Sequence, residues 1–304
     1  MAERAPLRVV VAVLTYRRPA DLAAVLPELV AQVGDVGGRV LVVDNDPEAG
    51  ARAAVDSFGA PVDYVHEPAP GIAAARNRAL DEADADLLVF VDDDERPRPG
   101  WLVALLDTYR DSRPAAVVGP VVSEYEVPPD PWVSAGRFFD RRRLPTGTEI
   151  EVAATNNLLL DLAQVGALRF DVRFGLTGGS DTLFSRALHR SGSRMVWCDE
   201  AVVVDVVPAS RVTREWVLRR AYRSGNSWSR TSLVLADGPA AALGARLSCT
   251  ARGVVRCLGG AARWGIGVLT GSVVHRARGR RTLMRGAGLV AGAWGGVYAE
   301  YGRG

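Results

Sequence analysis

The sequence contains no lysine, and arginine supplies all 37 of its basic side chains. Cysteine is scarce: Cys198, Cys249 and Cys257 fit no metal-binding spacing and no disulfide framework, so we expect a reducing compartment. The chain also lacks the glycine-rich phosphate loops of dinucleotide-binding enzymes and P-loop NTPases, which argues against both classes. No apolar run reaches the ~20 residues that a membrane-spanning helix needs.

The charge is distributed unevenly along the chain of 304 residues. From Arg211 onward there are 16 arginines against three acidic residues, a balance of +13 within a net charge of +2, which leaves −11 for the first 210 residues. An acidic body and a basic tail indicate that the two parts meet different partners.

The first hundred residues alternate between Val-rich runs and helical patterns. Four runs predict strands, and helices are expected between them; the N-terminal run ends without a cleavage site, so we interpret it as a strand and not as a secretory signal. Continuous apolar strands separated by helices are typical of a mostly parallel, Rossmann-like sheet with helices on both faces. Further strands are expected within 151–161 and 194–208, and a helix ending at Gly192. The first four predicted strands are 8–16, 39–46, 61–67 and 86–94.

Polar residues follow each of these four strands. In such a sheet, ligands bind beyond the carboxyl ends of the strands, so these residues should converge on one edge. They are Thr15 and Tyr16, Asp44 to Asp46, His66 and Glu67, and Asp92 to Asp94.

The run Asp92 to Glu95 is the most concentrated charge in the sequence. A run of acids on a loop is most often only solvated. At the binding edge of an α/β sheet, however, carboxylates are suited to hold Mg²⁺ or Mn²⁺ against substrate phosphates. Two further residues are candidates for function: Arg76, in a helix opened by Gly71, and Asp181, where a loop becomes a helix. An ordinary surface arginine and an ordinary helix-start acid are the plain alternatives.

Taken in order, several segments resemble family 2 glycosyltransferases, which are inverting enzymes with the GT-A fold. The resemblance covers about residues 7–225 and depends on the whole ordered set, because no one motif is decisive. The matching segments are 11–19, the strand end at Asp44, "GIAAARNRAL" (71–80), "VFVDDDE" (89–95) and "GGSDTLFSRALHRSG" (178–192).

The resemblance implies a role for each matching residue. Asp181 would be the catalytic base, and Arg76 would face the donor diphosphate. Asp94 and Asp92 would be the outer residues of the D-x-D motif and ligands of a divalent cation, with Asp205 as a further ligand. The nucleotide-sugar would be bound by Thr15, Tyr16, Arg17, Asp44, Asn45, Arg76, Asp92 and Asp93, and the acceptor side would hold Asn156, Asn157 and Trp197.

Two positions depart from the family pattern. Ser180 stands where a glutamate commonly precedes the base, and Asp205 stands where a histidine often reaches the metal. A retaining GT-A enzyme, a nucleotidyltransferase and a non-catalytic nucleotide-sugar-binding protein are therefore kept as alternatives. The nucleotidyltransferase is disfavoured because no glycine-rich loop follows the first strand.

We expect a glycosyltransferase domain at 1–225, with a nucleotide-sugar half at 1–112 and an acceptor half at 113–225. Residues 226–304 should form basic, Arg/Ala/Gly-rich amphipathic helices. Their uncharged stretches flanked by arginine suit the surface of an anionic membrane better than nucleic acid, and a soluble helical subdomain is the alternative. The expected partners are a nucleotide-diphosphate sugar and an acceptor hydroxyl, with a lipid-linked acceptor as one option. The expected location is the cytoplasm, with the inner face of the membrane as an option.

Overall fold

The computed structural model describes residues 7–298, and they form two compact units. The first unit comprises the described chain up to Val122 together with Arg141–Gly175 and Ser180–Asp205. The second comprises Ser123–Asp140, Leu176–Gly179 and the described chain from Val206 onward. The domain boundary expected after residue 225 falls inside helix α8 (Arg214–Val234).

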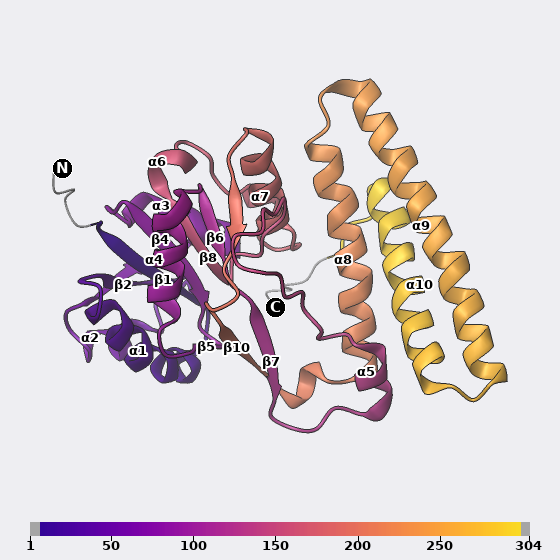
Figure 1. Cartoon of the computed structure of the whole chain (residues 1–304), viewed down its shortest axis with the longest axis horizontal. Coiled ribbons are helices and arrows are strands. Elements are labelled where there is room, and N and C mark those ends of the chain that lie inside the picture. Colours follow the sequence, from indigo (N-terminus) through magenta and orange to yellow (C-terminus); the bar gives the residue numbers. More distant parts are fainter. Residues whose placement is uncertain (1–6, 299–304) are drawn as a thin grey trace. The chain divides into compact units, whose positions relative to one another are not determined.

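A seven-stranded sheet of order β3-β2-β1-β4-β8-β6-β9 runs through the first unit (Figure 1). All neighbouring strands are parallel except β8, which is antiparallel to β4 and to β6. The predicted mostly parallel sheet is thereby confirmed. The strands are β1 (Val9–Thr15), β2 (Arg39–Asp44), β3 (Val62–His66), β4 (Leu87–Asp92), β6 (Ala116–Val118), β8 (Asn157–Asp161) and β9 (Met195–Trp197).

Helices cover both faces of this sheet, as the continuous apolar strands predicted. Alternate residues of β1 point to opposite sides: Val11 packs with helices α1 and α4, whereas Ala12 packs with α3 and α7. All seven residues of β1 are buried for this reason. The helices of the first unit are α1 (Pro19–Gly34), α2 (Arg52–Asp56), α3 (Ile72–Glu82), α4 (Trp101–Ser112), α6 (Leu162–Val165), α7 (Ser180–Arg190) and the 3₁₀ turn η1 (Val172–Phe174).

A second sheet has three strands in the order β5-β10-β7. They are β5 (Glu95–Pro97), β10 (Val203–Val207) and β7 (Val121–Tyr125). The run 194–208 therefore holds two strands, β9 and β10. The strand expected within 151–161 begins only at Asn157, because the residues before it lead into the sheet as a loop.

Three helices dominate the second unit and lie side by side in Figure 1. They are α8, α9 (Gly238–Leu269) and α10 (Val273–Ala293), preceded by α5 (Pro131–Gly136) and the turn η2 (Ala209–Arg211). The Arg/Ala/Gly-rich helical region is thus confirmed. Within residues 7–298, no helix combines the length and the hydrophobicity that crossing a bilayer requires.

Glycines form the contact between α9 and α10. A Cβ placed on Gly253 would lie 2.8 Å from the carbonyl oxygen of Gly286, and a Cβ on Gly260 would lie 2.8 Å from that of Gly279. A real side chain at either position would force the backbones apart. The two helices can approach this closely only because these positions carry no side chain.

Candidate active site

Polar ends of neighbouring strands meet at one edge of the large sheet. Thr15 is the register partner of Asp44, and Asp92 that of Leu14. Because β8 runs antiparallel, its first residue, Asn157, pairs with Val91 and reaches the same edge. The structure therefore places residues from four strands along one edge, as the strand pattern predicted.

The acidic run alternates between buried and accessible side chains. Asp92 closes β4 and Glu95 opens β5. Asp93 and Glu95 are buried, with 4% and 1% of their surface exposed, whereas Asp92 and Asp94 are partly exposed. Successive side chains of an extended chain point to opposite sides, so Asp92 and Asp94 share the side that a ligand can reach. These are the two outer residues of the D-x-D pattern.

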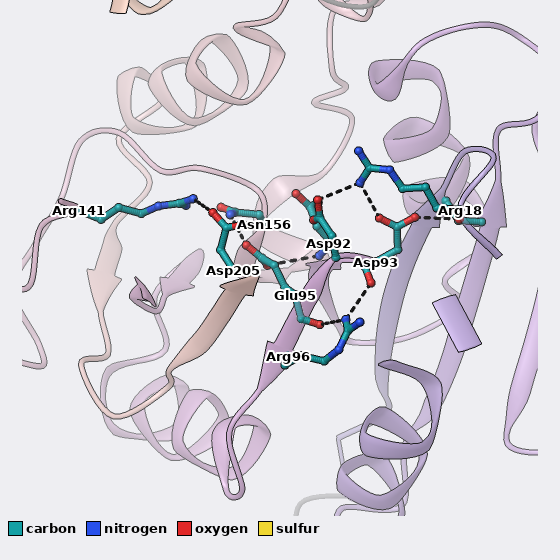
Figure 2. Close-up of polar contacts among 10 residues, drawn as sticks. Arg18, Asp92, Asp93, Glu95, Arg96, Arg141, Asn156 and Asp205 are labelled. Carbon is teal, nitrogen blue, oxygen red and sulfur yellow. Dashed lines mark hydrogen bonds and ion pairs between the residues drawn. The ribbon is translucent and has the colours of Figure 1, made fainter. Parts of the chain in front are cut away.

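Two side chains from the end of β1 hold the first part of the acidic run (Figure 2). The Thr15 hydroxyl donates to Asp93 Oδ2 at 2.8 Å. Arg18 donates through Nη1 to Asp93 Oδ1 at 3.2 Å and to Asp94 Oδ2 at 2.9 Å. The arginine partly offsets the repulsion between the adjacent carboxylates.

Glu95 belongs to a second group on the other side of Asp92 (Figure 2). The register between β5 and β10 sets Glu95 opposite Asp205. Asn156 donates through Nδ2 to Glu95 Oε1, and Arg141 forms an ion pair with Asp205. Two arginines, Arg18 and Arg141, therefore hold the two sides of the carboxylate cluster.

Burial raises the pKa of three of these acids. Desolvation, followed by repulsion from Asp94, raises the pKa of Asp92 to about 6, and desolvation raises that of Asp93 to about 7 against the opposing effect of Arg18. Desolvation and repulsion from Asp92 raise the pKa of Glu95 well above its usual value. The cluster thus holds more negative charge than its arginines balance, which is the condition under which a cation binds favourably.

Arg76 lies at the other boundary of the cluster. Its charge lowers the pKa of Asp92, and its Nη1 donates to the Ser180 hydroxyl at 2.9 Å. The guanidinium also lies over the Phe170 ring, 5.4 Å from the centroid. Ser180 is the first residue of α7, so Asp181 follows the Arg76 contact directly in the chain. The Oδ1 of Asp181 accepts from the backbone N–H of Thr182 at 2.7 Å.

The predicted nucleotide side is organised around Asp44 and Asn45. The fully buried Asp44 carboxylate accepts from the Tyr64 hydroxyl and the backbone N–H groups of Asp46 and Ala51. Asn45 bonds the carbonyls of Glu67 and Ala69 and accepts from the Gly71 N–H. Both residues therefore fix the loops that surround this edge.

Tyr16 and Arg17 lie just beyond the end of β1. Arg17 donates through Nε to Asp46 Oδ1 at 3.2 Å and covers the Tyr16 ring. Its side chain is half exposed. Arg17 thus points away from the carboxylates that its neighbour Arg18 contacts.

The three residues expected on the acceptor side lie in different surroundings. Asn156 joins the carboxylate cluster through Glu95. Asn157 is 1% exposed and bonds Trp101 and the carbonyls of Pro120 and Ala201. Trp197 in β9 is buried and donates to Asp199. Only Asn156 is bonded to the cluster; the acceptor roles of all three stay predictions.

A divalent cation fits the chemistry of the cluster. Within the described chain, no three His, Cys, Asp or Glu side chains converge as a preformed metal cage. The ligand-reachable pair Asp92 and Asp94 still supplies the hard oxygen donors that Mg²⁺ and Mn²⁺ prefer, next to buried acids with raised pKa values. Two carboxylates with substrate phosphates and water are a usual arrangement for such ions.

Four residues of this site were absent from the sequence-based set: Arg18, Glu95, Arg141 and the Arg76-binding role of Ser180. Arg18 and Glu95 directly adjoin residues that were predicted, so proximity in the sequence was a usable signal. Arg141 comes from a cluster of three arginines, and nothing in the sequence separates it from the other two.

Comparison with known proteins identifies the family. The model of glycosyl transferase family 2 matches residues 10–172, more than half of the chain. The chain is 37% identical over 270 residues to the succinoglycan biosynthesis protein ExoM of Rhizobium meliloti (strain 1021), covering 84% of this chain and 87% of that protein.

Solved structures agree with the fold. The mannosyltransferase PcManGT from Pyrobaculum calidifontis, in complex with GDP-Man and Mn²⁺, matches 95% of this chain and 88% of its own length, with a TM-score of 0.63 and 18% identity. The structure of GalNAc-T7 with UDP, GalNAc and Mn²⁺ matches 75% of this chain with a TM-score of 0.54 and 12% identity. The matched part is about half (51%) of the GalNAc-T7 chain. At these identities the likeness establishes the GT-A fold alone.

The family match and the relative at 37% identity confirm the resemblance seen in the ordered motifs: this chain belongs to glycosyl transferase family 2 and is a nucleotide-sugar-dependent glycosyltransferase.

Proposed function

We propose that this glycosyltransferase inverts the anomeric configuration and uses a divalent cation, Mg²⁺ or Mn²⁺. The alternation at the end of β4 carries the proposal. Asp92 and Asp94 are on the accessible side, while Asp93 and Glu95 are buried with raised pKa values. A cation bound by the accessible pair would offset this surplus of negative charge.

The donor would bind with its diphosphate between the cluster and Arg76. When bound, the cation supplies positive charge and Lewis-acid stabilisation to the leaving diphosphate. Asp92 and Asp94 would hold it, and Asp205 could join them only after its ion pair with Arg141 opens. Arg76 adds a fixed positive charge, because Ser180 and the Phe170 ring orient it without neutralising it. The nucleoside would be bound by Thr15, Tyr16, Arg17, Asp44, Asn45 and Asp93.

Asp181 would act as the general base. The acceptor oxygen forms a bond to the anomeric carbon while the bond from that carbon to the diphosphate breaks, and the hydroxyl proton passes to the Asp181 carboxylate. Attack from the face opposite the leaving group inverts the configuration. A positioned base contributes roughly 10²–10⁴-fold to the rate, or about 3–5 kcal/mol.

We also propose a lipid-linked acceptor, approached on the side of Asn156, Asn157 and Trp197. The reaction would then take place on the cytoplasmic side, at the inner face of the membrane, with the basic C-terminal helices as the membrane contact. Their arginines, without lysine and with few acids, suit anionic lipid.

The test is a panel of UDP-, GDP- and dTDP-sugars, with Mn²⁺ or with EDTA, and with membrane lipid extract as acceptor. We expect release of nucleoside diphosphate from one donor, dependent on the cation. Asp181→Asn should lower this rate about 10²–10⁴-fold while the donor still binds. Asp107→Asn, on the exposed face of α4, is the matched control and should keep the parent rate.

The outcomes separate the alternatives. A product with retained anomeric configuration, determined by NMR, would identify a retaining enzyme. Donor binding without turnover on any acceptor would favour a non-catalytic nucleotide-sugar-binding protein. Equal turnover by the Asp181→Asn variant and the parent would refute the role of the base.

A further inference from the structure

The outer face of α9 carries a continuous stripe of exposed apolar side chains. Val255, Leu258 and Leu269 are 69%, 67% and 88% exposed, which is unusual for large aliphatic residues in a folded protein. The face opposite the stripe is occupied, because Gly253 and Gly260 pack there against α10. We call the following residues the α9 stripe: Leu243, Leu247, Val254, Val255, Leu258 and Leu269.

The spacing of these residues defines one face of the helix. At 3.6 residues per turn, the α9 stripe falls within an arc of about 120° and runs about 40 Å along the axis. No charged residue lies within that arc; alanines and glycines fill the positions between the large side chains. Arg252, Arg256 and Arg263 follow one another along one border of the arc.

The charge on this hairpin has one sign. From the start of α9 to the end of α10 there are nine arginines and no aspartate or glutamate. Arginine beside an apolar stripe is the pattern of a helix that lies in a membrane interface, where the apolar face enters about 5–10 Å and the basic side chains meet lipid phosphates. Trp264, 43% exposed, adds a side chain that favours the same interface.

We infer that the α9 stripe docks on an anionic phospholipid bilayer, with α9 parallel to the surface. This inference builds on the proposed membrane location and assigns it to one helical face. A second copy of the chain fits less well, because a symmetric pairing along α9 would bring arginines of two copies together without acids to offset them. A spanning arrangement is not part of the inference, since none of the described helices meets the requirements for crossing.

The test is flotation of the full chain with vesicles of phosphatidylcholine alone and of phosphatidylcholine with about 30% phosphatidylglycerol. At about 0.1 M salt, where charges are screened beyond about 10 Å, we expect flotation with the anionic vesicles and little with the neutral ones. Val255→Glu combined with Leu258→Glu should weaken binding about a hundredfold, because two buried aliphatic contacts are lost. Val103→Glu, on the exposed face of α4, is the matched control and should float like the parent.

The charge contribution is tested separately. Arg252→Gln combined with Arg256→Gln should weaken binding to anionic vesicles about 20–30-fold and leave the weak binding to neutral vesicles unchanged. Circular dichroism confirms that each variant is folded. Unchanged flotation of the stripe variant would overturn the inference, and so would a parent that does not float but forms dimers that the stripe variant dissolves.

Membrane binding and catalysis give independent readouts. A chain that floats but never releases nucleoside diphosphate supports this inference and contradicts the proposed function. A chain that is active on a soluble acceptor and does not float contradicts the inference alone.

Discussion

Replacing Asp93 by asparagine should make the stability difference between variant and parent depend on pH. Asp93 is 4% exposed, and its pKa in the folded protein is about 7, against about 3.9 in an unfolded chain. Between these values the folded parent binds a proton that the unfolded chain releases, so parent stability falls as pH rises from about 4 to about 7. About three pKa units correspond to about 4 kcal/mol at pH 8.

The variant lacks this titration because its side chain is neutral at every pH. We therefore expect Asp93→Asn to match the parent within about 1 kcal/mol near pH 4, where both side chains are neutral, and to be more stable by about 2–4 kcal/mol at pH 8. Urea unfolding of both proteins at the two pH values, without added metal, measures the difference. A constant difference across this range would refute the assignment of the buried charge. With Mn²⁺ present the gap at pH 8 should narrow, because a nearby cation stabilises the charged carboxylate.

Two further changes test local packing. Ser180→Ala removes the acceptor of the buried Arg76 guanidinium and should lower the free energy of unfolding by about 1–3 kcal/mol, measured in urea; a loss below about 0.5 kcal/mol would mean that the contact is replaceable. Gly260→Ala places a Cβ 2.5 Å from the backbone nitrogen of Leu283 and should destabilise the hairpin by about 1–3 kcal/mol. Gly259→Ala, which meets nothing within 4 Å, should instead stabilise it by about 0.5–1 kcal/mol; equal effects at the two glycines would contradict the close approach of the helices.

The sheet and its binding edge could be predicted from the sequence because both depend on local patterns. Continuous apolar runs mark strands covered on both faces, and the polar residues that end them must meet at one edge when the strands are parallel. The acidic run shows the limit of that reasoning. Its pattern located the cluster, but only tertiary packing decides that Asp93 and Glu95 are buried while Asp92 and Asp94 remain accessible.

Adjacent arginines show why the remaining contacts were not predictable. Arg17 adopts a left-handed backbone conformation with φ of 55°, and its side chain reaches Asp46, while the next residue, Arg18, reaches the carboxylate cluster. The sequence offers no pattern that distinguishes the two. Similarly, the glycines between 238 and 269 would ordinarily weaken a helix, yet α9 is continuous because several of them pack against α10.

The glycine contact between α9 and α10 limits how this hairpin can change in length. Gly253 and Gly260 are seven residues apart, as are their partners Gly286 and Gly279, so the contact repeats every two turns. An insertion of any other length in one helix would turn the glycines away and bring side chains into the contact. The hairpin can therefore grow or shrink only in paired steps of about 10 Å, and each step changes the length of the apolar stripe on the opposite face of α9 by the same amount.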